Sequence, residues 1–360
     1  MGEKRLFISD VHLGAGRFSD ESRDKDKYPF DWDWLSMEET KNFMNFIKFL
    51  QSGYDHEIKE VVLLGDIFDN WIFPHDLMPP TMDELLTADK NKDVVRELND
   101  LAKKCSVFYV PGNHDMHATR EIMNEFFSDF IYCPKRFSSG RLIAEHGHLY
   151  AMFNAPARYS NNIMGLPLGY FISRIEATRK AMTDRDGRTY RTYVDDFIEV
   201  AGKQTLPQSV LEAVIEEADL DEDIEYKVKR KGGTDQSISA LHVKDVYKDI
   251  YNDWPTNVVS KHRAVFAELD MLGPIADKLC KDENYQVCIF GHSHKSEIDK
   301  DSWFVDDRIY ANAGYWCGEK CTFVETEKTA TGYDVCIVKW RGDNKIKRGK
   351  MVSIKAGSLF

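Results

Sequence analysis

Long apolar runs are missing from the sequence. No window approaches the roughly 20 consecutive apolar residues that a membrane-spanning helix requires. The amino terminus passes from Met1–Arg5 into an apolar stretch that covers only Leu6–Ile8. Such a stretch is too short for the apolar region of a secretory signal. We therefore expect no transmembrane segment and a cytoplasmic location.

Cysteines are few, and none of them forms the closely spaced CxxC pair that is typical of zinc-thiolate or redox sites. The chain has 7 cysteines, which is an odd number. Free thiols in a reducing compartment fit this pattern better than a disulfide framework does. Cys317 and Cys321 are close in sequence, and we interpret them as two unpaired thiols near a strand.

Basic residues are outnumbered, because 48 Lys and Arg stand against 60 Asp and Glu, for a formal net charge of −12. A surface this acidic repels phosphate backbones over long distances, which argues against bulk nucleic-acid binding. The composition, 42% hydrophobic and 30% charged, is otherwise ordinary for a globular protein. A length of 360 residues allows one large domain, or one domain that carries a sizeable insertion.

Short apolar runs with the length and composition of buried strands are present, and a polar residue or glycine follows each of them closely. These runs are Arg5–Ser9, Val61–Leu64, Val107–Val110, Leu142–Ala144 and Val287–Phe290. Amphipathic patterns between the first three predict helices over Met37–Leu50 and Val94–Lys103. Strands that alternate with helices in this way indicate an α/β architecture.

Carboxylate, imidazole and amide side chains collect where these strands end. The motifs are Asp10-Val11-His12, Gly65-Asp66-Ile67-Phe68-Asp69, Gly112-Asn113-His114-Asp115, Glu145-His146-Gly147-His148 and Gly291-His292-Ser293-His294. Ligands of α/β sheets bind just beyond the carboxyl ends of the strands. Mixed nitrogen and oxygen ligands suit Mn²⁺, Fe, Co²⁺ or Zn²⁺ better than Ca²⁺. The groups are too many for one tetrahedral ion and suit two ions that share a carboxylate.

In this order the motifs resemble those of the calcineurin-like metallophosphoesterase superfamily, over Leu6–Tyr150 and Asp282–Trp316. The resemblance implies an α/β fold: a β-sandwich of two mixed sheets flanked by helices, in four αββα layers, here with a mainly helical insertion. It also implies that Asp66 bridges two metal ions and that His114 is the acid or electrostatic stabiliser, oriented by Asp69. The implied ligands are Asp10, His12 and His294 for the first ion, and Asn113, His146 and His292 for the second. His148 and Asn312 are further candidates for contact with the substrate.

The ligand set predicts a phosphoesterase that hydrolyses a phosphate mono- or diester. Two divalent ions would lower the pKa of a shared water, and the resulting metal-bridging hydroxide would attack phosphorus in line with the leaving oxygen. His114, if protonated, would offset charge on the leaving group. Manganese is the favoured metal, with Fe, Zn²⁺, Co²⁺ and Ni²⁺ as alternatives.

Residues 156–255 interrupt the strand-and-motif pattern, and we predict a mainly helical insertion or cap there, with 1–155 and 256–360 forming the catalytic core. Helical patterns in the insertion cover Phe171–Met182, Arg191–Val200, Gln208–Ala218 and Ile238–Trp254. The tail from Ile309 to Val352 alternates apolar and polar residues, which predicts several antiparallel strands. Tyr28–Trp34 is either a loop at the rim of the site or a loop anchored by its aromatic residues.

The substrate is open, and a small-molecule or lipid-linked phosphoester is expected as the partner. Phe7–Gly14 and Gly65–Ile72 look like the UDP-2,3-diacylglucosamine pyrophosphatase branch, but His114 stands where that branch usually carries arginine. An apolar stretch, Ile163–Ile172, is either a cap over an acyl chain or a packed cap helix. A nuclease of the same fold and a non-catalytic metal-binding scaffold are further alternatives.

Overall fold

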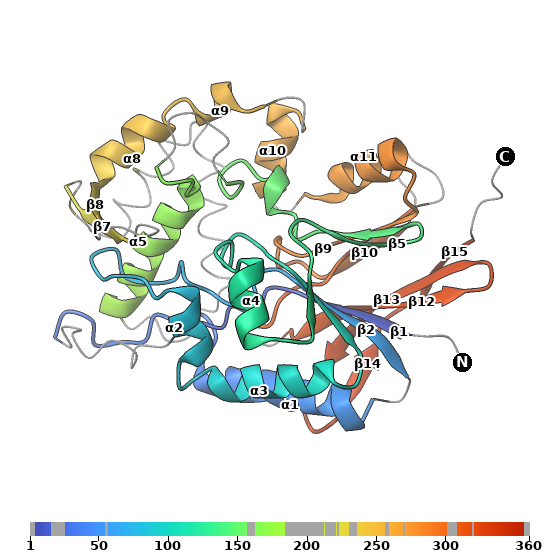
Figure 1. The fold of residues 1–360 in the computed structure, drawn as a ribbon. Helices are drawn as coiled ribbons and strands as arrows, with labels where there is room; N and C mark the ends of the chain where they lie inside the picture. The colour runs from blue at the N-terminus through green and yellow to red at the C-terminus, as the bar shows by residue number, and fades with distance from the viewer. Residues whose placement is uncertain are drawn as a thin grey trace.

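Two β-sheets pack face to face in this computed structural model, and helices cover both outer faces (Figure 1). The structure describes residues 4–15, 26–54, 57–156, 163–183, 212, 221, 223–229, 236–255, 259–268, 271–300, 308–318 and 320–355. Both sheets contain parallel and antiparallel pairs. The predicted arrangement of two mixed sheets flanked by helices is therefore confirmed.

The larger sheet, within the described residues, has the strand order β14-β13-β12-β1-β2-β3-β4, and β15 pairs with β13. Strands β1 to β4 run parallel, whereas β12 joins β1 in the antiparallel sense. The strands are β1 (Lys4–Ile8), β2 (Ile58–Leu64), β3 (Ser106–Val110), β4 (Phe130–Tyr132), β12 (Thr322–Thr329), β13 (Gly332–Trp340), β14 (Ile346–Arg348) and β15 (Val352–Lys355).

The smaller sheet, within the same residues, has the order β10-β11-β9-β6-β5. Its strands are β5 (Phe137–Ser139), β6 (Leu142–Ala144), β9 (Val287–Phe290), β10 (Glu297–Lys300) and β11 (Ile309–Asn312). Strand β9 lies parallel to both β6 and β11. The prediction of antiparallel strands for the tail is thus correct for β12 to β15 and wrong for the pairing of β11 with β9.

Alternation along the strands explains the layers. In β1, Leu6 and Ile8 face the helices that cover the larger sheet, while Phe7 faces the other sheet. In β2, Val62 and Leu64 join Phe7 in the core between the sheets. Successive side chains of a strand point to opposite faces, so both faces of these strands are apolar because both are covered.

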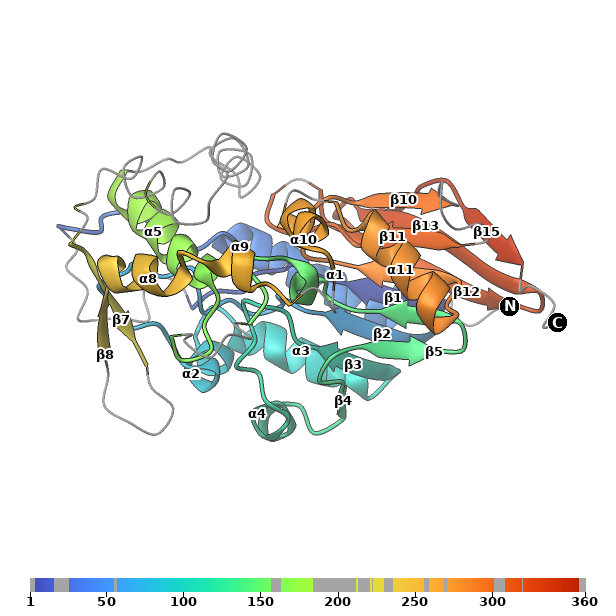
Figure 2. The same cartoon turned by 90° about the horizontal axis from the view of Figure 1, so that it is seen from above.

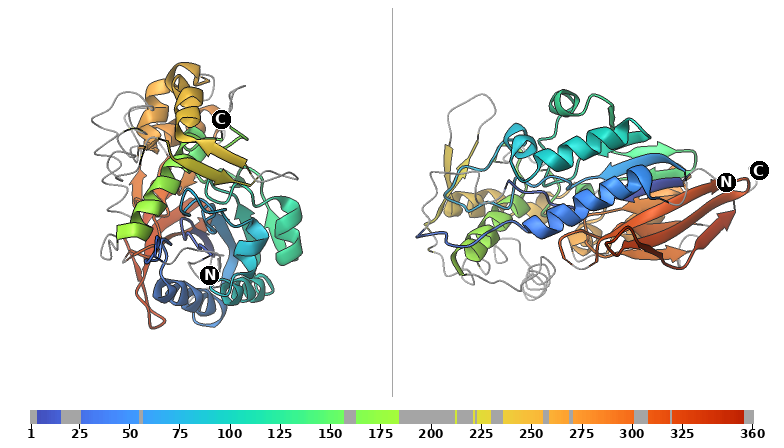
Figure 3. Two further views of the ribbon diagram at one scale, coloured as in Figure 1. Left: turned by 90° about the vertical axis from the view of Figure 1, so that its left-hand side faces the viewer. Right: turned by 90° about the horizontal axis from the view of Figure 1, so that it is seen from below.

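Helices α1 (Met37–Ser52) and α3 (Lys92–Ala102) run side by side along the larger sheet, as Figure 3 shows from below. Ser36 and Glu39 form a capping box that fixes the start of α1. Shorter helices α2 (Met82–Thr87) and α4 (Arg120–Phe126) lie beside α3, and α11 (Gly273–Glu283) covers the smaller sheet. The helices predicted over Met37–Leu50 and Val94–Lys103 are confirmed.

Elements of the predicted insertion gather at one end of the sandwich (Figure 2). They are α5 (Leu168–Thr183), β7 (Glu225–Val228), β8 (Gln236–Ser239), α8 (Ala240–Tyr247) and α9 (Ile250–Asp253), followed by α10 (Lys261–Glu268). The β7–β8 hairpin was not predicted, and the prediction that a helix begins at Ile238 is wrong, because Ile238 pairs with Tyr226 in that hairpin. The predicted helices over Arg191–Val200 and Gln208–Ala218 lie outside the described residues, apart from Glu212.

A buried arginine ties α5 to the loop that follows β2. The guanidinium of Arg174 donates to the carbonyls of Phe73, Pro74 and Leu77 at 2.6 Å each, and to that of Lys227 in β7 at 3.0 Å. These bonds hold the loop in place just after the residues that end β2.

Among the described residues, no helix combines the length and the apolarity that a membrane-spanning helix requires.

Candidate metal centre

Five of the proposed ligands lie in an unusual backbone conformation at the carboxyl ends of the strands. The φ angles are 55° at Asp10, 56° at His12, 52° at Asp66, 67° at His292 and 54° at His294. These angles fall in the left-handed region, which non-glycine residues rarely adopt. Residues that do adopt it occur most often at functional sites. The chain leaves the extended form after Ile8, so Asp10 and His12 converge through tight turns rather than through strand alternation.

Two glycines allow these turns to approach one another closely. A Cβ atom at Gly112 would lie 2.1 Å from Oδ1 of Asp66, and one at Gly291 would lie 2.6 Å from Oδ2 of Asp10. Any side chain at either position would displace a carboxylate of the site. The glycines at these two positions therefore make room for the carboxylates of Asp66 and Asp10.

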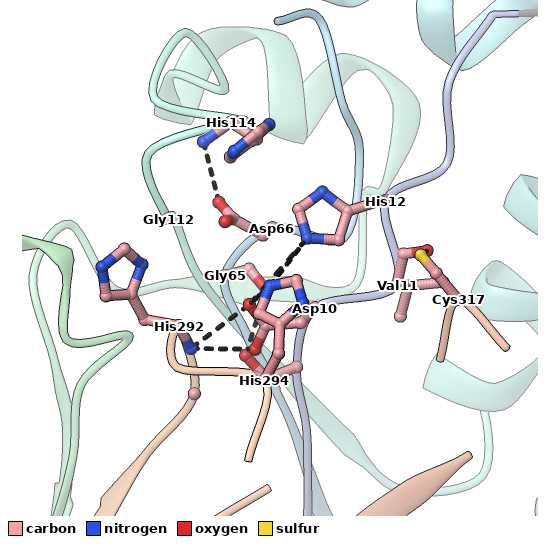
Figure 4. Close-up of polar contacts among 12 residues, drawn as sticks. Asp10, Val11, His12, Gly65, Asp66, Gly112, His114, His292, His294 and Cys317 are labelled. Atoms are coloured by element: carbon pink, nitrogen blue, oxygen red, sulfur yellow. Dashed lines mark hydrogen bonds and ion pairs between the residues drawn. The ribbon is translucent and has the colours of Figure 1, made fainter. Parts of the chain in front are cut away.

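Asp10, His12 and His294 form the first group (Figure 4). Nε2 of His294 lies 2.9 Å from Oδ1 of Asp10 and 3.2 Å from Nε2 of His12. Burial lowers the pKa of His294 to about 4, although Asp10 opposes this shift. The ring is therefore neutral near pH 7 and offers a lone pair to a cation.

Asp66, Asn113, His146 and His292 form the second group. Nε2 of His146 lies 3.1 Å from Oδ2 of Asp66 and 3.2 Å from Oδ1 of Asn113. His292 brings a ring nitrogen within 4.8 Å of the ligand atoms of Asp66 and His146. Its backbone N–H donates to Oδ2 of Asp10 at 2.9 Å, which ties the second group to the first.

Asp66 lies between the two groups, and ring nitrogens of His12 and His114 also come within 4.8 Å of its carboxylate. Its Oδ1 accepts the backbone N–H of His114 at 2.8 Å. Burial alone would raise the pKa of Asp66, but His146 and His114 hold it well below its ordinary value. The carboxylate is therefore ionised and placed to be shared by two cations.

The chemistry of the donor set fits a cation at the second group. Nδ1 of His146 lies 2.8 Å from the carbonyl oxygen of Leu64, and a carbonyl can only accept, so this nitrogen carries the proton. Nε2 of a neutral His146 would then present a lone pair to the oxygens of Asp66 and Asn113. These three atoms would then all be acceptors that face one another. Such an arrangement is stable only if a metal ion or an extra proton lies between them. Burial lowers the pKa of His146, but Asp66 and Asp10 outweigh this and raise it to about 9.

Asp69 orients two histidines rather than the one that was expected. Its Oδ2 lies 2.8 Å from Nδ1 of His12 and 3.0 Å from Nδ1 of His114. Its Oδ1 accepts the backbone N–H groups of Trp71 and Ile72. One carboxylate therefore fixes both rings, and Nε2 of His12 is left to face the first group.

Tryptophans enclose His114. Its ring centroid lies 4.4 Å from that of Trp71 and 5.3 Å from that of Trp34, and Trp34 also lies 4.9 Å from the ring of His12. Trp32 from the same loop is fully buried and packs against Phe73. The loop that contains Tyr28–Trp34 is therefore anchored by one tryptophan and borders the site with the other.

The side-chain amide of Asn312 makes its hydrogen bonds within the protein. Its buried Nδ2 donates to the carbonyl of Gly291 at 2.7 Å and to Oγ of Ser293 at 3.0 Å. Its Oδ1 accepts the N–H of Gly314. Both polar atoms are therefore engaged inside the protein, where they hold the turn that carries His292, and the substrate contact stays a prediction. His148 lies beside His146, with ring centroids 5.3 Å apart, and belongs to none of the candidate ligand groups.

Asp115 is a residue of the site to which the sequence assigned no role. Its carboxylate accepts the N–H groups of Ile67 at 2.9 Å and Gly112 at 2.6 Å, and the hydroxyl of Tyr109 at 2.5 Å. Burial and the nearby charge of Asp66 raise the pKa of Asp115 to about 6. Asp115 joins the ends of β2 and β3, and its place as the last residue of the third motif was the available signal.

All seven cysteines are unpaired, as expected.

Comparison with known proteins indicates the family of this chain. The family model described as calcineurin-like phosphoesterase matches residues 4–296, which confirms the resemblance that the motifs indicated. A search of curated proteins finds no match. Similar solved structures include a dimetal phosphatase from Danio rerio, 12% identical over 98% of each chain with a TM-score of 0.41. Vacuolar Protein Sorting 29 from Cryptosporidium parvum is 10% identical over 99% of each chain, with a TM-score of 0.36. Pseudomonas putida nuclease MPE is 16% identical over 39% of this chain and 53% of that chain, with a TM-score of 0.25.

Proposed function

We propose that this chain, which belongs to the calcineurin-like phosphoesterase family, hydrolyses a phosphate mono- or diester with the help of two divalent metal ions. The observation that carries the proposal is the pair of ligand groups joined by Asp66. Asp10, His12 and His294 would hold one ion, and Asn113, His146 and His292 would hold the other. Oxygen and imidazole ligands without a thiolate favour Mn²⁺, with iron, Zn²⁺, Co²⁺ and Ni²⁺ as alternatives.

Two bound cations would supply water of lowered pKa and neutralise charge on the phosphoryl oxygens. The chain's own residues orient the reaction. Asp69 and Asp66 raise the pKa of His114 despite its burial, which favours the protonated ring. Nδ1 of this ring faces Asp69, which leaves Nε2 to donate a proton or a hydrogen bond to the leaving oxygen. Trp71 and Trp34 cover the ring and limit the access of water.

The substrate class is a small-molecule or lipid-linked phosphoester. The net charge of −12 argues against a long polyanion, because an acidic surface repels phosphate backbones. Phe171 and Ile175 of α5 are fully buried. Their burial supports the interpretation of α5 as a helix packed on the core, and not as a cap that opens to admit an acyl chain. A cytoplasmic location is part of the same proposal.

A substrate panel with Mn²⁺ tests the proposal. It compares p-nitrophenyl phosphate with its bis-ester, and then adds nucleotides, sugar-nucleotide lipids and single-stranded DNA. We expect one of the small esters to be hydrolysed, and we expect Asp66→Ala and His292→Ala to lose that activity while they remain folded. The matched control is His242→Ala, because His242 is exposed on α8. Full activity in Asp66→Ala would exclude this site, and two bound ions without hydrolysis of any ester would favour a non-catalytic scaffold.

A further inference from the structure

A chain of hydrogen bonds links the end of α10 to the ligand Asn113. The carboxylate of Glu268 accepts the backbone N–H groups of Phe153 and Asn154, the latter at 3.1 Å. Its other oxygen accepts Nδ2 of Asn154 at 2.8 Å. Oδ1 of Asn154 in turn accepts Nδ2 of Asn113 at 3.3 Å, and Oδ1 of Asn113 faces Nε2 of His146.

The direction of this chain follows from the carboxylate at its end. An ionised carboxylate can only accept, so Asn154 must turn its NH₂ group toward Glu268 and its oxygen toward Asn113. Asn113 can meet that oxygen only with its own NH₂ group. Its carbonyl oxygen is then directed into the second group, which is the orientation that a metal ligand needs.

The middle of the chain is held in place by α5. The backbone N–H of Gly169 donates to the carbonyl of Phe153 at 2.8 Å. A Cβ atom at Gly169 would lie 2.4 Å from Oδ1 of Asn154. The close approach of this helix limits movement of the Asn154 amide to a flip in place, which exchanges its oxygen and its NH₂ group.

We propose that Glu268 and Asn154 are positioning residues that direct the carbonyl oxygen of Asn113 toward the second metal ion. The inference rests on the proposed function, since it requires an ion at the second group. It adds two residues that make no contact with that ion. Residues that orient metal ligands in this indirect way typically change metal affinity by about 10- to 100-fold when replaced.

The ionised form of Glu268 is available near neutral pH. Burial raises the pKa of Glu268 to about 7, and the donors from Phe153 and Asn154 limit that rise. Within the part of the chain that the structure describes, its hydrogen-bond partners are all N–H donors. Titrations with metal are therefore best made at a pH of about 8, where the carboxylate is mostly ionised.

The first test is Glu268→Gln, studied by calorimetric titration of the full chain with Mn²⁺. The new amide must turn its oxygen to the two backbone N–H groups, so its NH₂ group faces Asn154. Asn154 then has to rotate, and Asn113 has to rotate with it and withdraw its oxygen from the second group. We expect the affinity for the second Mn²⁺ to fall about 10- to 100-fold, with the first site and the metal-free melting temperature nearly unchanged.

The matched control is Glu97→Gln. Glu97 on α3 is also a largely buried carboxylate that accepts a side-chain amide, Nε2 of Gln51 at 3.1 Å, and it lies outside the site. We expect this variant to bind both ions as the unaltered protein does. It therefore separates the loss of one buried carboxylate from the loss of the chain that reaches Asn113.

The second test is the double variant Glu268→Gln with Asn154→Asp. The new amide at 268 would donate to the new carboxylate at 154, whose other oxygen accepts Nδ2 of Asn113. The orientation of Asn113 is restored, and the net charge equals that of the unaltered protein. We expect affinity for the second Mn²⁺ to return to within a few-fold of the original value.

The outcomes separate the possibilities. If the unaltered protein binds two ions and Glu268→Gln binds them equally well, the positioning role is wrong while the proposed function stands. Equal weakening of both ions together with a lower melting temperature, or a double variant no better than the single one, would also overturn the role. If the unaltered protein binds no second ion, the proposed function and this inference fail together.

Discussion

Buried carboxylates lie at both ends of β1, and the chain neutralises them differently at each end. At the start of β1, Glu325 lies 3.2 Å from Lys4 and 2.9 Å from Arg348, and Glu327 lies 2.6 Å from Lys4. Tyr54 donates to Glu325 as well. We name these residues the charged cluster, because lysine and arginine keep their charge at any physiological pH.

At the other end of β1, the carboxylates of Asp10 and Asp66 face imidazoles. An imidazole carries charge only when it is protonated. The charged cluster is therefore complete without a ligand, whereas the candidate metal centre balances its carboxylates only with extra protons or with bound cations. The comparison teaches that the kind of basic partner, rather than burial itself, separates a structural cluster of carboxylates from a candidate site.

The largest effect is expected from Asp66→Asn, which removes the shared charge of the metal centre. Hydrolysis of the best ester should fall by about 1,000-fold, equivalent to roughly 4 kcal/mol of transition-state stabilisation. Mn²⁺ titration should show that the pair of ions is lost, while the metal-free protein unfolds no earlier than before. If Asp66→Asn lost activity only because less of the protein was folded, Asp66 would have a structural role. The two ends of β1 would then not differ in the way described above.

Glu325→Gln makes the corresponding change in the charged cluster. It leaves the partly exposed Arg348 and the buried Lys4 with less compensation, and the free energy of unfolding should fall by about 3 kcal/mol. Urea denaturation measures this fall. The activity of the remaining folded protein and its Mn²⁺ stoichiometry should not change, and a change in either would mean that the clusters are coupled.

His114→Ala tests the division of roles inside the metal centre. We expect kcat to fall by about 100-fold, because the proposed role of the ring is at the leaving group, while affinity for Mn²⁺ changes only a few-fold. Steady-state kinetics and calorimetry on the same preparation compare the two quantities. An equal loss of both would make His114 a ligand, as its closeness to Asp66 and His12 allows.

The smallest effect concerns pH and the metal-free protein. The carboxylates raise the pKa of His146 from 6.5 to about 9 and also raise that of His114. Protonation of the folded state therefore contributes stability that is complete below about pH 6.5 and is lost as the pH rises through about 9. In chelator, the free energy of unfolding should decline across this window, and Mn²⁺ should remove the decline because the ion replaces the proton.

The charged cluster provides the control for this experiment. The pKa of Glu325 is lowered from 4.5 and that of Lys4 is raised from 10.5, so neither titrates in the window. Glu325→Gln should therefore show the same decline from a lower starting stability. His146→Gln should show a smaller decline, and an unchanged decline in that variant would exclude His146 as its source.

The sequence predicted the strands and the residues that gather at their ends, because both signals are local. A short apolar run followed by Asp or His is visible within ten residues, as at Asp10 and His12. The convergence of those two side chains depends instead on backbone angles of 55° and 56°, which alternation along a strand does not predict. The sequence therefore predicts which residues lie near one another, but the turns that bring them together are visible only in the structure.

The residues that the sequence left unassigned act through distant partners. Glu268 and Asn154, for example, are 114 positions apart. No periodicity links such pairs, since they meet only after the sheets and α10 have packed. The β7–β8 hairpin was missed for a related reason, because Ile238 sits at the start of a pattern that also suits a helix.

The left-handed backbone at the ligands has a consequence for how this protein can diverge. Asparagine, aspartate, histidine and glycine adopt that conformation at low cost, whereas β-branched residues do so rarely. A library randomised at Asp10, His12 and His292 and selected for folding alone should therefore accumulate glycine and asparagine and exclude valine and isoleucine. A descendant that no longer needed these side chains would carry such replacements, so the turns would persist after the candidate ligands had been lost.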